Sequence, residues 1–417
     1  MLLNRDRALG FMKEFRIDAL LGTTPVNLHY LSDFSPWLLW FYRLFTKENF
    51  MFQSYALFPR DQPPALMPMA DGASIAYLAE WPSWIEDVYP FGPGAAAAEA
   101  PPHYPPEIHR LFALYRRSLE LKLNTGGEAI VRAMRDRDLT SGVVGVDSAG
   151  MKPEELEYAR QELPNVRFKE AGELFRLIRM VKTPEEIELL RKAGEINRRG
   201  FNALLEAAVI GASETDLTRA HRAAVSTLGA VPVFCNNACG PFAITHWEPR
   251  TYTLKAGDTV YCDAGCTYKY YHADGNVVGV LGEPTKRHRE LFDAQLEGAA
   301  NARAKARPGV KISEVLDAFS EGELKSGAVK NAYNFGHALG LEPRDLPMIQ
   351  KPFWTARDDF IDISHDVTLE AGMVFNLEEA QREFGIGSVA VEVTLVTTPT
   401  GCEFLLPPPK LEMLPVG

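Results

Sequence analysis

The chain has 417 residues, of which 46% are hydrophobic and 24% are charged, and its formal net charge is −11. That length allows two domains with cores of their own, and the acidic balance excludes a typical nucleic-acid-binding protein, which carries a basic excess. No stretch is long and apolar enough to cross a bilayer, and the charged start Met-Leu-Leu-Asn-Arg-Asp-Arg is not typical of a signal peptide.

The first part of the chain alternates short buried strands with helices. The expected elements are a helix at 5–15, a strand at 17–21, a turn at 24–25, a strand at 142–147 and a helix at 153–162. Alternation of this kind predicts an α/β domain over residues 1–174. The Pro-, Ala- and Gly-rich stretch 92–107 indicates a surface loop.

A second domain is expected from residue 175 to residue 417. Thr183-Pro184-Glu185-Glu186 is a strong helix start, with Thr as the N-cap, Pro at the first helical position and Glu three residues after the cap. This helix is expected to reach Ala207, a second to begin at 213–216, and a third to span Thr285 to Ala306. Because the strands lie between and after these helices, the domain is predicted to be α+β.

Four carboxylates lie inside strand-like apolar runs of this second domain: Asp263 and Asp274, the first pair, and Glu378 and Glu392, the second pair. An ionised carboxylate on a half-buried strand is costly unless a positive charge meets it. A bound cation is the economical partner, and four such oxygen donors could hold two metal ions. For any one of them alone, the alternative is a strand-edge carboxylate that faces water.

The spacing of the carboxylates predicts two hairpins. If the members of the first pair face each other across an antiparallel pair of strands, the turn falls near Tyr268-Lys269. The same construction for the second pair puts the centre of the turn at Gly385, inside Phe-Gly-Ile-Gly, whose composition suits a hairpin turn. Two hairpins with opposed carboxylates would form a cage for two metal ions.

Two histidines could complete this site. A carboxylate cage often includes one imidazole, and His337 is the candidate because flanking glycines let other backbone approach closely; a structural histidine in a Gly-rich turn is the alternative. His246 lies seventeen positions before Asp263. A neutral histidine there could donate a hydrogen bond to a developing oxyanion or accept a proton, or it could be a plain loop histidine.

Five cysteines in a chain of this length do not suggest a disulfide framework, so we expect a reducing, cytoplasmic environment. The pairs Cys235/Cys239 and Cys262/Cys266 lack the spacing of a usual zinc knuckle. Cys262 also precedes Asp263 on one predicted strand, so the two side chains point to opposite faces. We expect these four thiols to be buried like small hydrophobic side chains.

Residues 175–400 resemble the creatinase/Xaa-Pro peptidase (M24) family with its pita-bread fold. The family's motifs are matched in chain order at 177–187, His246, Asp263-Ala264-Gly265, Asp274, Gly336-His337, 373–378 and Glu392-Val393-Thr394. The first half resembles that family's N-terminal, creatinase-like domain, notably at 17–21 and 27–31. The resemblance therefore covers nearly the whole chain.

The resemblance implies a dinuclear metallohydrolase of the Xaa-Pro dipeptidase or aminopeptidase type. Water bridging two metal ions would attack an amide bond, Glu378 would take its proton, and His246 would stabilise the tetrahedral oxygen. The two divalent ions would be Mn²⁺ in the first place, with Co²⁺, Fe²⁺ or Zn²⁺ as alternatives. The implied metal ligands are Asp263, Asp274, His337, Glu378 and Glu392.

Residues around the metal positions depart from the family's usual pattern. Arg344 takes the place of a second histidine that usually follows the metal histidine. The other departures are 275–278 instead of Thr-Arg after Asp274, Glu379-Ala380 instead of Pro-Gly after Glu378, and Ala390-Val391 instead of an arginine before Glu392. A hydrolase or lyase acting on a small non-peptide substrate, of the ectoine, creatine or sulfonio-compound type, therefore stays open, as does an interaction protein that has lost its chemistry.

Three residues are candidates for substrate binding. Arg344 could clamp a substrate carboxylate through two hydrogen bonds, or it could be a surface arginine beside Asp345. In the family, the N-terminal domain of one subunit often reaches the partner's site, so we expect a homodimer in which Trp37 and Trp40 wall the pocket; a plain interface or core cluster is the alternative. The expected partner is a dipeptide or another small molecule, not a nucleic acid or a membrane.

Overall fold

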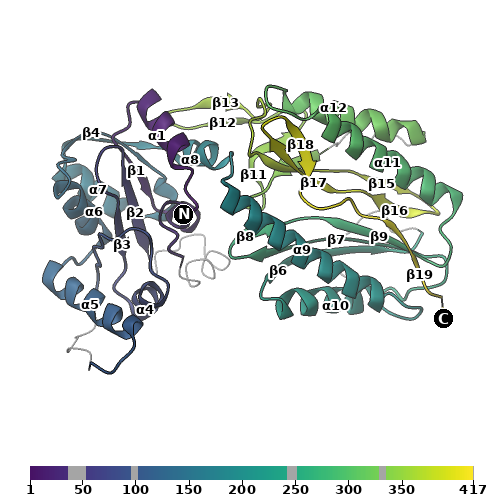
Figure 1. Ribbon diagram of the computed structural model, residues 1–417, viewed down its shortest axis with the longest axis horizontal. Helices are drawn as coiled ribbons and strands as arrows, with labels where there is room; N and C mark the ends of the chain where they lie inside the picture. The colour runs from purple at the N-terminus through teal and green to yellow at the C-terminus, as the bar shows by residue number, and fades with distance from the viewer. Residues whose placement is uncertain (36–52, 95–101, 242–250, 328–334, 417) are drawn as a thin grey trace. The chain divides into compact units, whose positions relative to one another are not determined.

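The computed structural model describes residues 1–35, 53–94, 102–241, 251–327 and 335–416 (Figure 1). The chain divides into two compact units. The first unit comprises Met1–Ile178 and Ala356–Asp362, and the second comprises Arg179–Thr355 and Ile363–Gly417. The division thus falls four residues later than the boundary expected from the sequence, and the segment 356–362 belongs with the first unit.

The first unit is built on a sheet of order β3-β2-β1-β4-β5. Its central strand β1 runs antiparallel to β2 and parallel to β4. β1, β2 and β3 are buried throughout, as expected for strands covered on both faces. The strands are β1 (Ala19–Gly22), β2 (Ser54–Pro59), β3 (Ala65–Pro68), β4 (Ser141–Val146) and β5 (Asn165–Glu170). The helices are α1 (Arg5–Glu14), α2 (Pro25–Ser32), α4 (Gly72–Glu80), α5 (Pro106–Leu121), α6 (Gly126–Arg135), α7 (Pro153–Glu162) and α8 (Gly172–Arg179).

Most of the predicted elements of this unit are confirmed, but the turn at 24–25 is wrong. Helix α2 begins there instead, because the Thr24 side chain caps it by accepting a hydrogen bond from Asn27 N, and Pro25 suits the first helical position. Asp147, at the end of β4, accepts further hydrogen bonds from Thr24 N, Thr24 Oγ1 and Asn27 Nδ2. The loop expected at 92–107 also ends early, since α5 starts at Pro106.

The second unit contains two larger sheets and a short ribbon, and a further short ribbon falls on its boundary with the segment 356–362 of the first unit. One larger sheet has the order β19-β9-β7-β6, with β8 paired to β7, and the other has the order β11-β10-β14-β17-β18. The strands are β6 (Val231–Cys239), β7 (Thr259–Tyr268), β8 (Tyr271–Ala273), β9 (Asn276–Leu281), β10 (Phe335–Ala338), β11 (Asp345–Gln350), β14 (Val374–Glu378), β17 (Val393–Thr398), β18 (Gly401–Phe404) and β19 (Leu411–Leu414). The ribbons pair β12 (Thr355–Arg357) with β13 (Asp362–Ser364) and β15 (Ala380–Glu383) with β16 (Gly387–Ala390).

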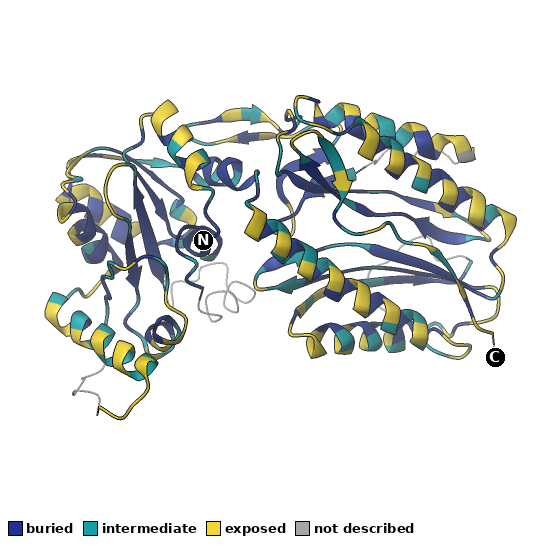
Figure 2. Ribbon diagram, in the orientation of Figure 1, coloured by how far each residue is buried: buried dark blue, intermediate teal, exposed yellow. Residues whose placement is uncertain are grey.

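Two pairs of helices cover these sheets from outside (Figure 1). Helices α9 (Pro184–Ala207) and α10 (Glu214–Thr227) pack on the sheet of β6, β7 and β8, and α11 (Lys286–Lys305) and α12 (Ile312–Glu323) lie over the other. The strands are mostly buried, while the helices expose their outer faces (Figure 2). The predicted helices at 183–207, from 213 onward and at 285–306 are confirmed, and α9 opens with the predicted capping box. Within the described residues, we find no helix with the length and apolar character needed to span a membrane.

The cysteines behave as expected from the sequence. All five lie in described residues and none forms a disulfide there, and Cys235, Cys239, Cys262 and Cys266 are buried. The first three belong to the hydrophobic core beneath α9 and α10, and Cys235 Sγ lies 3.5 Å from Cys262 Sγ. They therefore pack as small apolar side chains on the face of β7 opposite to Asp263.

Candidate metal centre

The first pair of carboxylates is positioned by the β7–β8 hairpin. Its turn consists of Lys269 and Tyr270, whose φ values of 46° and 69° give the left-handed conformation of a tight two-residue turn. In the resulting register Asp263 lies opposite Asn276, not opposite Asp274. The predicted pairing is therefore wrong by two residues, because the turn falls one residue later than expected. A shift of two residues keeps both carboxylates on one face of the strands.

The second pair follows its predicted register. β15 and β16 pair Glu383 with Gly387, so the turn is centred on Gly385, which has a φ of 90°. The same register continues where β14 and β17 pair Leu377 with Val393. Glu378 and Glu392 therefore stand opposite each other between the two paired segments. The predicted hairpin and its turn centre are confirmed.

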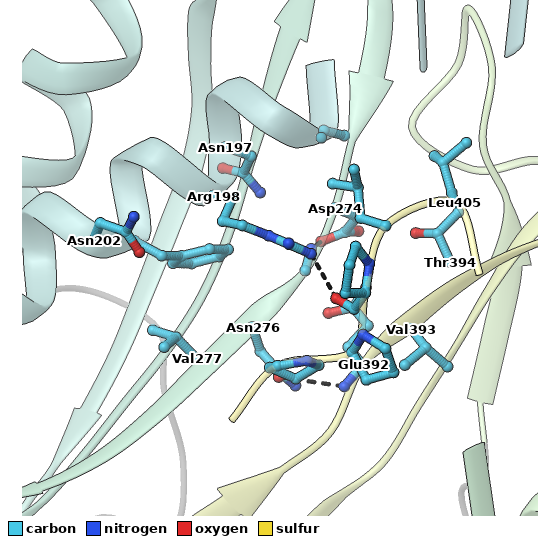
Figure 3. A pocket seen from close by; sticks show the side chains of 18 of the residues that line it. Asn197, Arg198, Asn202, Asp274, Asn276, Val277, Glu392, Val393, Thr394 and Leu405 are labelled. Atoms are coloured by element: carbon cyan, nitrogen blue, oxygen red, sulfur yellow. Dashed lines mark hydrogen bonds between the residues drawn. The ribbon is translucent and has the colours of Figure 1, made fainter. Parts of the chain in front are cut away.

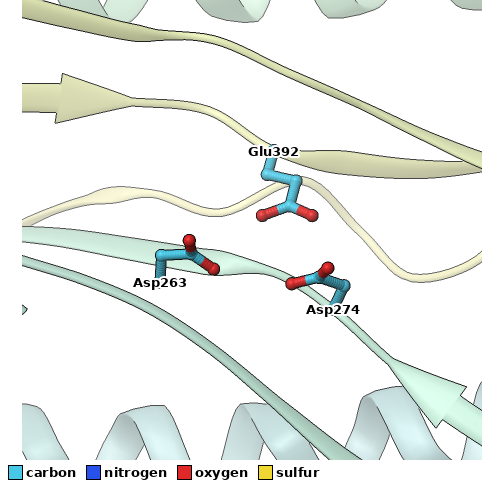
Figure 4. A group of neighbouring side chains, drawn as sticks. All are labelled: Asp263, Asp274 and Glu392. Atoms are coloured by element: carbon cyan, nitrogen blue, oxygen red, sulfur yellow. The ribbon is translucent and has the colours of Figure 1, made fainter. Parts of the chain in front are cut away.

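The two hairpins bring their carboxylates together. Asp263, Asp274 and Glu392 each offer an oxygen atom, and these atoms all lie within 4.8 Å of one another. Figure 4 shows Asp263 and Asp274 on one sheet directed toward Glu392 on the opposite side. His337 on β10 joins this group, since its Nε2 lies 3.4 Å from Asp274 Oδ2 and 3.9 Å from Glu378 Oε1. All five residues singled out in the sequence as metal ligands thus converge.

The electrostatics of this cluster suit bound cations. Burial raises the pKa of the Glu378 carboxyl well above its ordinary value, and the negative charges of Asp263 and Asp274 raise it further. Burial and the same neighbours also raise the pKa of Glu392, and Glu392 Oε2 is buried with no hydrogen-bond partner among the described residues. Divalent ions would compensate these negative charges, and one of them would bind the unpartnered oxygen of Glu392. Carboxylates with one imidazole fit Mn²⁺, Fe²⁺, Co²⁺ or Zn²⁺.

Asn376 is a buried support for this site that the sequence analysis missed. Its side chain is fully buried on β14. Its Oδ1 accepts a hydrogen bond from His337 N at 3.0 Å, and its Nδ2 donates to Glu392 Oε1 at 2.6 Å. One side chain therefore fixes the positions of two candidate ligands. The available signal was a polar residue inside the apolar run Met-Val-Phe-Asn-Leu, two positions before Glu378 and so on the same strand face.

Asn276 supports the site from the other sheet. Its Oδ1 accepts a hydrogen bond from Glu392 N at 3.3 Å, and it stands opposite Asp263 in the β7–β9 pair. This residue lies in the stretch 275–278, where the sequence departs from the family's usual Thr-Arg. In place of Thr-Arg, this chain therefore has an asparagine whose side chain forms a hydrogen bond between the candidate ligands.

Arg344 lies beside the candidate metal centre. Its guanidinium carbon is 5.1 Å from the centroid of the Phe335 ring, and that ring lies 5.5 Å from the His337 ring. Phe335 is also paired with Glu378 across β10 and β14. The placement is compatible with the expected substrate clamp. His246, Trp37 and Trp40 lie outside the described residues, so their roles stay predictions.

A cavity of about 450 Å³ reaches two of the candidate ligands, Asp274 and Glu392, from the side of α9. Figure 3 shows the Arg198 side chain extending from α9 into this space, where its Nη2 donates to Pro407 O at 2.5 Å. Apolar residues of α9, β9 and the segment 405–409 form much of its wall. Two of the clustered carboxylates are thus accessible from a cavity within the second unit.

Comparisons with known proteins agree with this geometry. The model of metallopeptidase family M24 matches residues 188–399, just over half of the chain. An Xaa-Pro dipeptidase of Pyrococcus furiosus is 27% identical over 251 residues, which cover 59% of this chain and 68% of that protein. An ectoine hydrolase of Halomonas elongata is 25% identical over 291 residues, covering 66% and 70%.

The fold has close counterparts among solved structures. The prolidase of Pyrococcus horikoshii OT3 superposes with a TM-score of 0.67 at 22% identity, covering 98% of each chain. An Xaa-Pro dipeptidase of Bacillus anthracis gives a TM-score of 0.69 at 18% identity, covering 98% of this chain and 99% of that one. These likenesses confirm the predicted fold class, α+β with a pita-bread second domain.

Proposed function

This chain belongs to metallopeptidase family M24, and we propose that it is a metal-dependent hydrolase that cleaves Xaa-Pro dipeptides with two divalent ions, Mn²⁺ in the first place. The observation that carries the proposal is the convergence of four carboxylates from two hairpins with His337 from β10. Relatives that share this family and fold include Xaa-Pro dipeptidases from several organisms.

In this proposal the ligand set is Asp263, Asp274, His337, Glu378 and Glu392. The ions, when bound, would polarise the substrate carbonyl and lower the pKa of the attacking water. Glu378 would accept a proton from that water and pass it to the leaving nitrogen. His246 would donate a hydrogen bond to the carbonyl oxygen as it becomes negative. Arg344 would hold the C-terminal carboxylate of the dipeptide through two parallel hydrogen bonds.

Removing the metal tests this proposal. Dialysis against EDTA is expected to abolish hydrolysis of Gly-Pro, and added Mn²⁺ is expected to restore it, with two ions per chain by elemental analysis. Gly-Ala serves as the control dipeptide, because it lacks the proline. Two bound ions without turnover of Gly-Pro would contradict the peptidase assignment, and ectoine would then be tested. Absence of bound metal after careful loading would contradict both enzyme assignments.

We also propose that the protein acts in the cytoplasm as a homodimer whose Trp37 and Trp40 wall the partner's substrate pocket. The five cysteines, none of which forms a disulfide in the described structure, support a reducing compartment. The N-terminal domain often reaches across the dimer in the family that the sequence resembles, which supports the second part.

Changing the two tryptophans tests the dimeric pocket. The Trp37→Ala and Trp40→Ala double variant is expected to raise KM for Gly-Pro about tenfold, as loss of an aromatic wall costs on the order of 1 kcal/mol, while light scattering still reports a dimer. Trp81→Ala is the matched control, since Trp81 is 56% exposed at the end of α4. An unchanged KM in the double variant would refute the pocket role, and a monomer would assign the cluster to the interface alone.

A further inference from the structure

Two cationic side chains are buried next to the loop that joins β10, which carries His337, to β11. The side chain of Arg179 is 2% exposed and that of Lys182 is fully buried. Burying a cation is costly unless carboxylates meet it with good geometry. Here they meet Glu342, Asp345 and Glu186, so a network of opposite charges replaces the lost hydration.

Arg179 joins two carboxylates on either side of Arg344. Its Nη2 donates to Glu342 Oε2 at 2.7 Å and to Asp345 Oδ1 at 3.2 Å. Between these two acids stand only Pro343 and Arg344. The Arg179 guanidinium therefore links the residues on either side of the Pro343-Arg344 pair.

Lys182 supports the same carboxylate differently. Its Nζ lies 3.7 Å from Asp345 Oδ2, but its ion pairs do not include Glu342 among the contacts described for the second unit. Asp345 Oδ1 also accepts a hydrogen bond from Leu346 N. Lys182 thus compensates the buried charge of Asp345. Arg179 does the same and also joins the two carboxylates that flank Arg344 in the loop.

The regular strand pairing does not set the position of this loop. β10 and β11 pair His337 with Met348, then shift register and pair Ala338 with Asp345. The loop 339–344 follows this irregularity, and its start is held by a hydrogen bond from His272 N to Gly340 O at 3.0 Å. Its far end, next to Arg344, is held by the carboxylates of Glu342 and Asp345. The ion pairs with Arg179 therefore constrain the chain on both sides of Arg344.

We propose that Arg179 is a positioning residue for substrate recognition. By bridging Glu342 and Asp345 it holds the Arg344 guanidinium over the Phe335 ring, beside His337 and the metal cluster. It thereby sets the affinity for a substrate carboxylate without touching the substrate. The proposal rests on the proposed function, in which Arg344 binds the carboxylate of the dipeptide. A residue that only stabilises the fold would change the melting temperature without changing KM selectively.

Arg179→Lys is the decisive variant, because lysine keeps the charge but replaces the guanidinium, whose Nη2 donates to both carboxylates, with a shorter side chain that ends in a single ammonium group. The metal-loaded full chain is expected to show about a tenfold higher KM for Gly-Pro with kcat nearly unchanged, the pattern for lost substrate binding. L-proline as a competitive inhibitor should weaken by a similar factor, whereas prolinamide, which lacks the carboxylate, should not.

A double-mutant cycle with Arg344→Met tests whether both residues act on one interaction. If Arg179 acts through Arg344, then adding Arg179→Lys to Arg344→Met raises KM no further. Glu297→Gln is the control, since it breaks an exposed ion pair with Lys325 on the outer helix α11. Fully additive effects would overturn the proposal.

Glu342→Gln covers the case in which Arg179→Lys fails to fold. The Glu342 side chain is 24% exposed, and this change weakens one arm of the bridge while Asp345 keeps both of its cations. It is expected to raise KM about threefold at an unchanged melting temperature. Unchanged KM in both folded variants would overturn the positioning role alone. Wild-type protein that binds metal yet does not hydrolyse Gly-Pro would instead overturn the proposed function.

Discussion

Glu378→Gln is expected to lower kcat for Gly-Pro hydrolysis by about 10²–10⁴-fold, the usual contribution of a positioned general base. The amide has nearly the size of the carboxylate but cannot take a proton from the attacking water. Glu378 stands at the end of β14, opposite Glu392 in the shared register and 3.9 Å from His337 Nε2. Among the cluster residues from that sheet, Glu378 alone has a partly exposed side chain, at 23%, since His337 and Glu392 are buried.

The measurement must separate the loss of a base from the loss of a ligand. Steady-state kinetics at saturating Mn²⁺ would be paired with elemental analysis of the same sample. Glu383→Gln is the matched control, because Glu383 belongs to the adjoining ribbon and pairs with Arg287 at its surface. A variant that keeps two ions and more than a tenth of the wild-type kcat would contradict the role as base. A variant that has lost an ion would show Glu378 to be needed first as a ligand.

The sequence predicts correctly those parts of the molecule whose conformation depends on residues close together in the chain. Helix α9 begins at Pro184 because Thr183 and Glu186 form a capping box within four residues. The second hairpin is centred on Gly385 because a glycine there adopts a positive φ readily. The carboxylates could be recognised because a charge inside an apolar strand has a cost that its own neighbours in sequence cannot offset.

The parts that the sequence does not predict depend on long-range packing. The first hairpin turns at Lys269 and Tyr270, two residues without the glycine or asparagine that usually marks left-handed backbone, so its register was misplaced. Arg179 meets Glu342 across 163 positions of sequence. No local pattern predicts such a pairing, because the end of α8 and the loop before β11 come together only in the folded chain.

Assembly of the site requires both larger sheets of the second unit. Asp263 and Asp274 come from β7 and the segment after β8, whereas His337, Glu378 and Glu392 come from β10, β14 and the segment before β17. The asparagines connect these contributions, since Asn276 holds the backbone of Glu392 from the opposite sheet. Neutral asparagine side chains therefore hold the charged groups of the candidate metal centre through hydrogen bonds. Replacing one of these asparagines tests this support without removing a candidate ligand.

Asn376→Leu is expected to lower the affinity for the metal ions by about 10–100-fold, the usual effect of removing a group that orients a ligand. Leucine has a similar volume but leaves His337 N and Glu392 Oε1 without the partners they have at 3.0 Å and 2.6 Å. Asn376 is fully buried and is not placed to touch the substrate. Excess Mn²⁺ is therefore expected to restore kcat, which distinguishes this variant from Glu378→Gln.

Isothermal titration of metal-free protein with Mn²⁺ would measure this loss directly, without reference to any substrate. Asn124→Leu is the matched control, because it makes the same change at an exposed position just before α6 in the first unit and should leave the affinity unaltered. If Asn376→Leu bound Mn²⁺ as tightly as the wild type, the hydrogen bonds to His337 and Glu392 would be irrelevant to the metal. If the affinity fell but saturating Mn²⁺ did not restore kcat, Asn376 would have a role in catalysis beyond holding the two ligands, and the division between supporting and reacting residues drawn from the geometry would be wrong at this position.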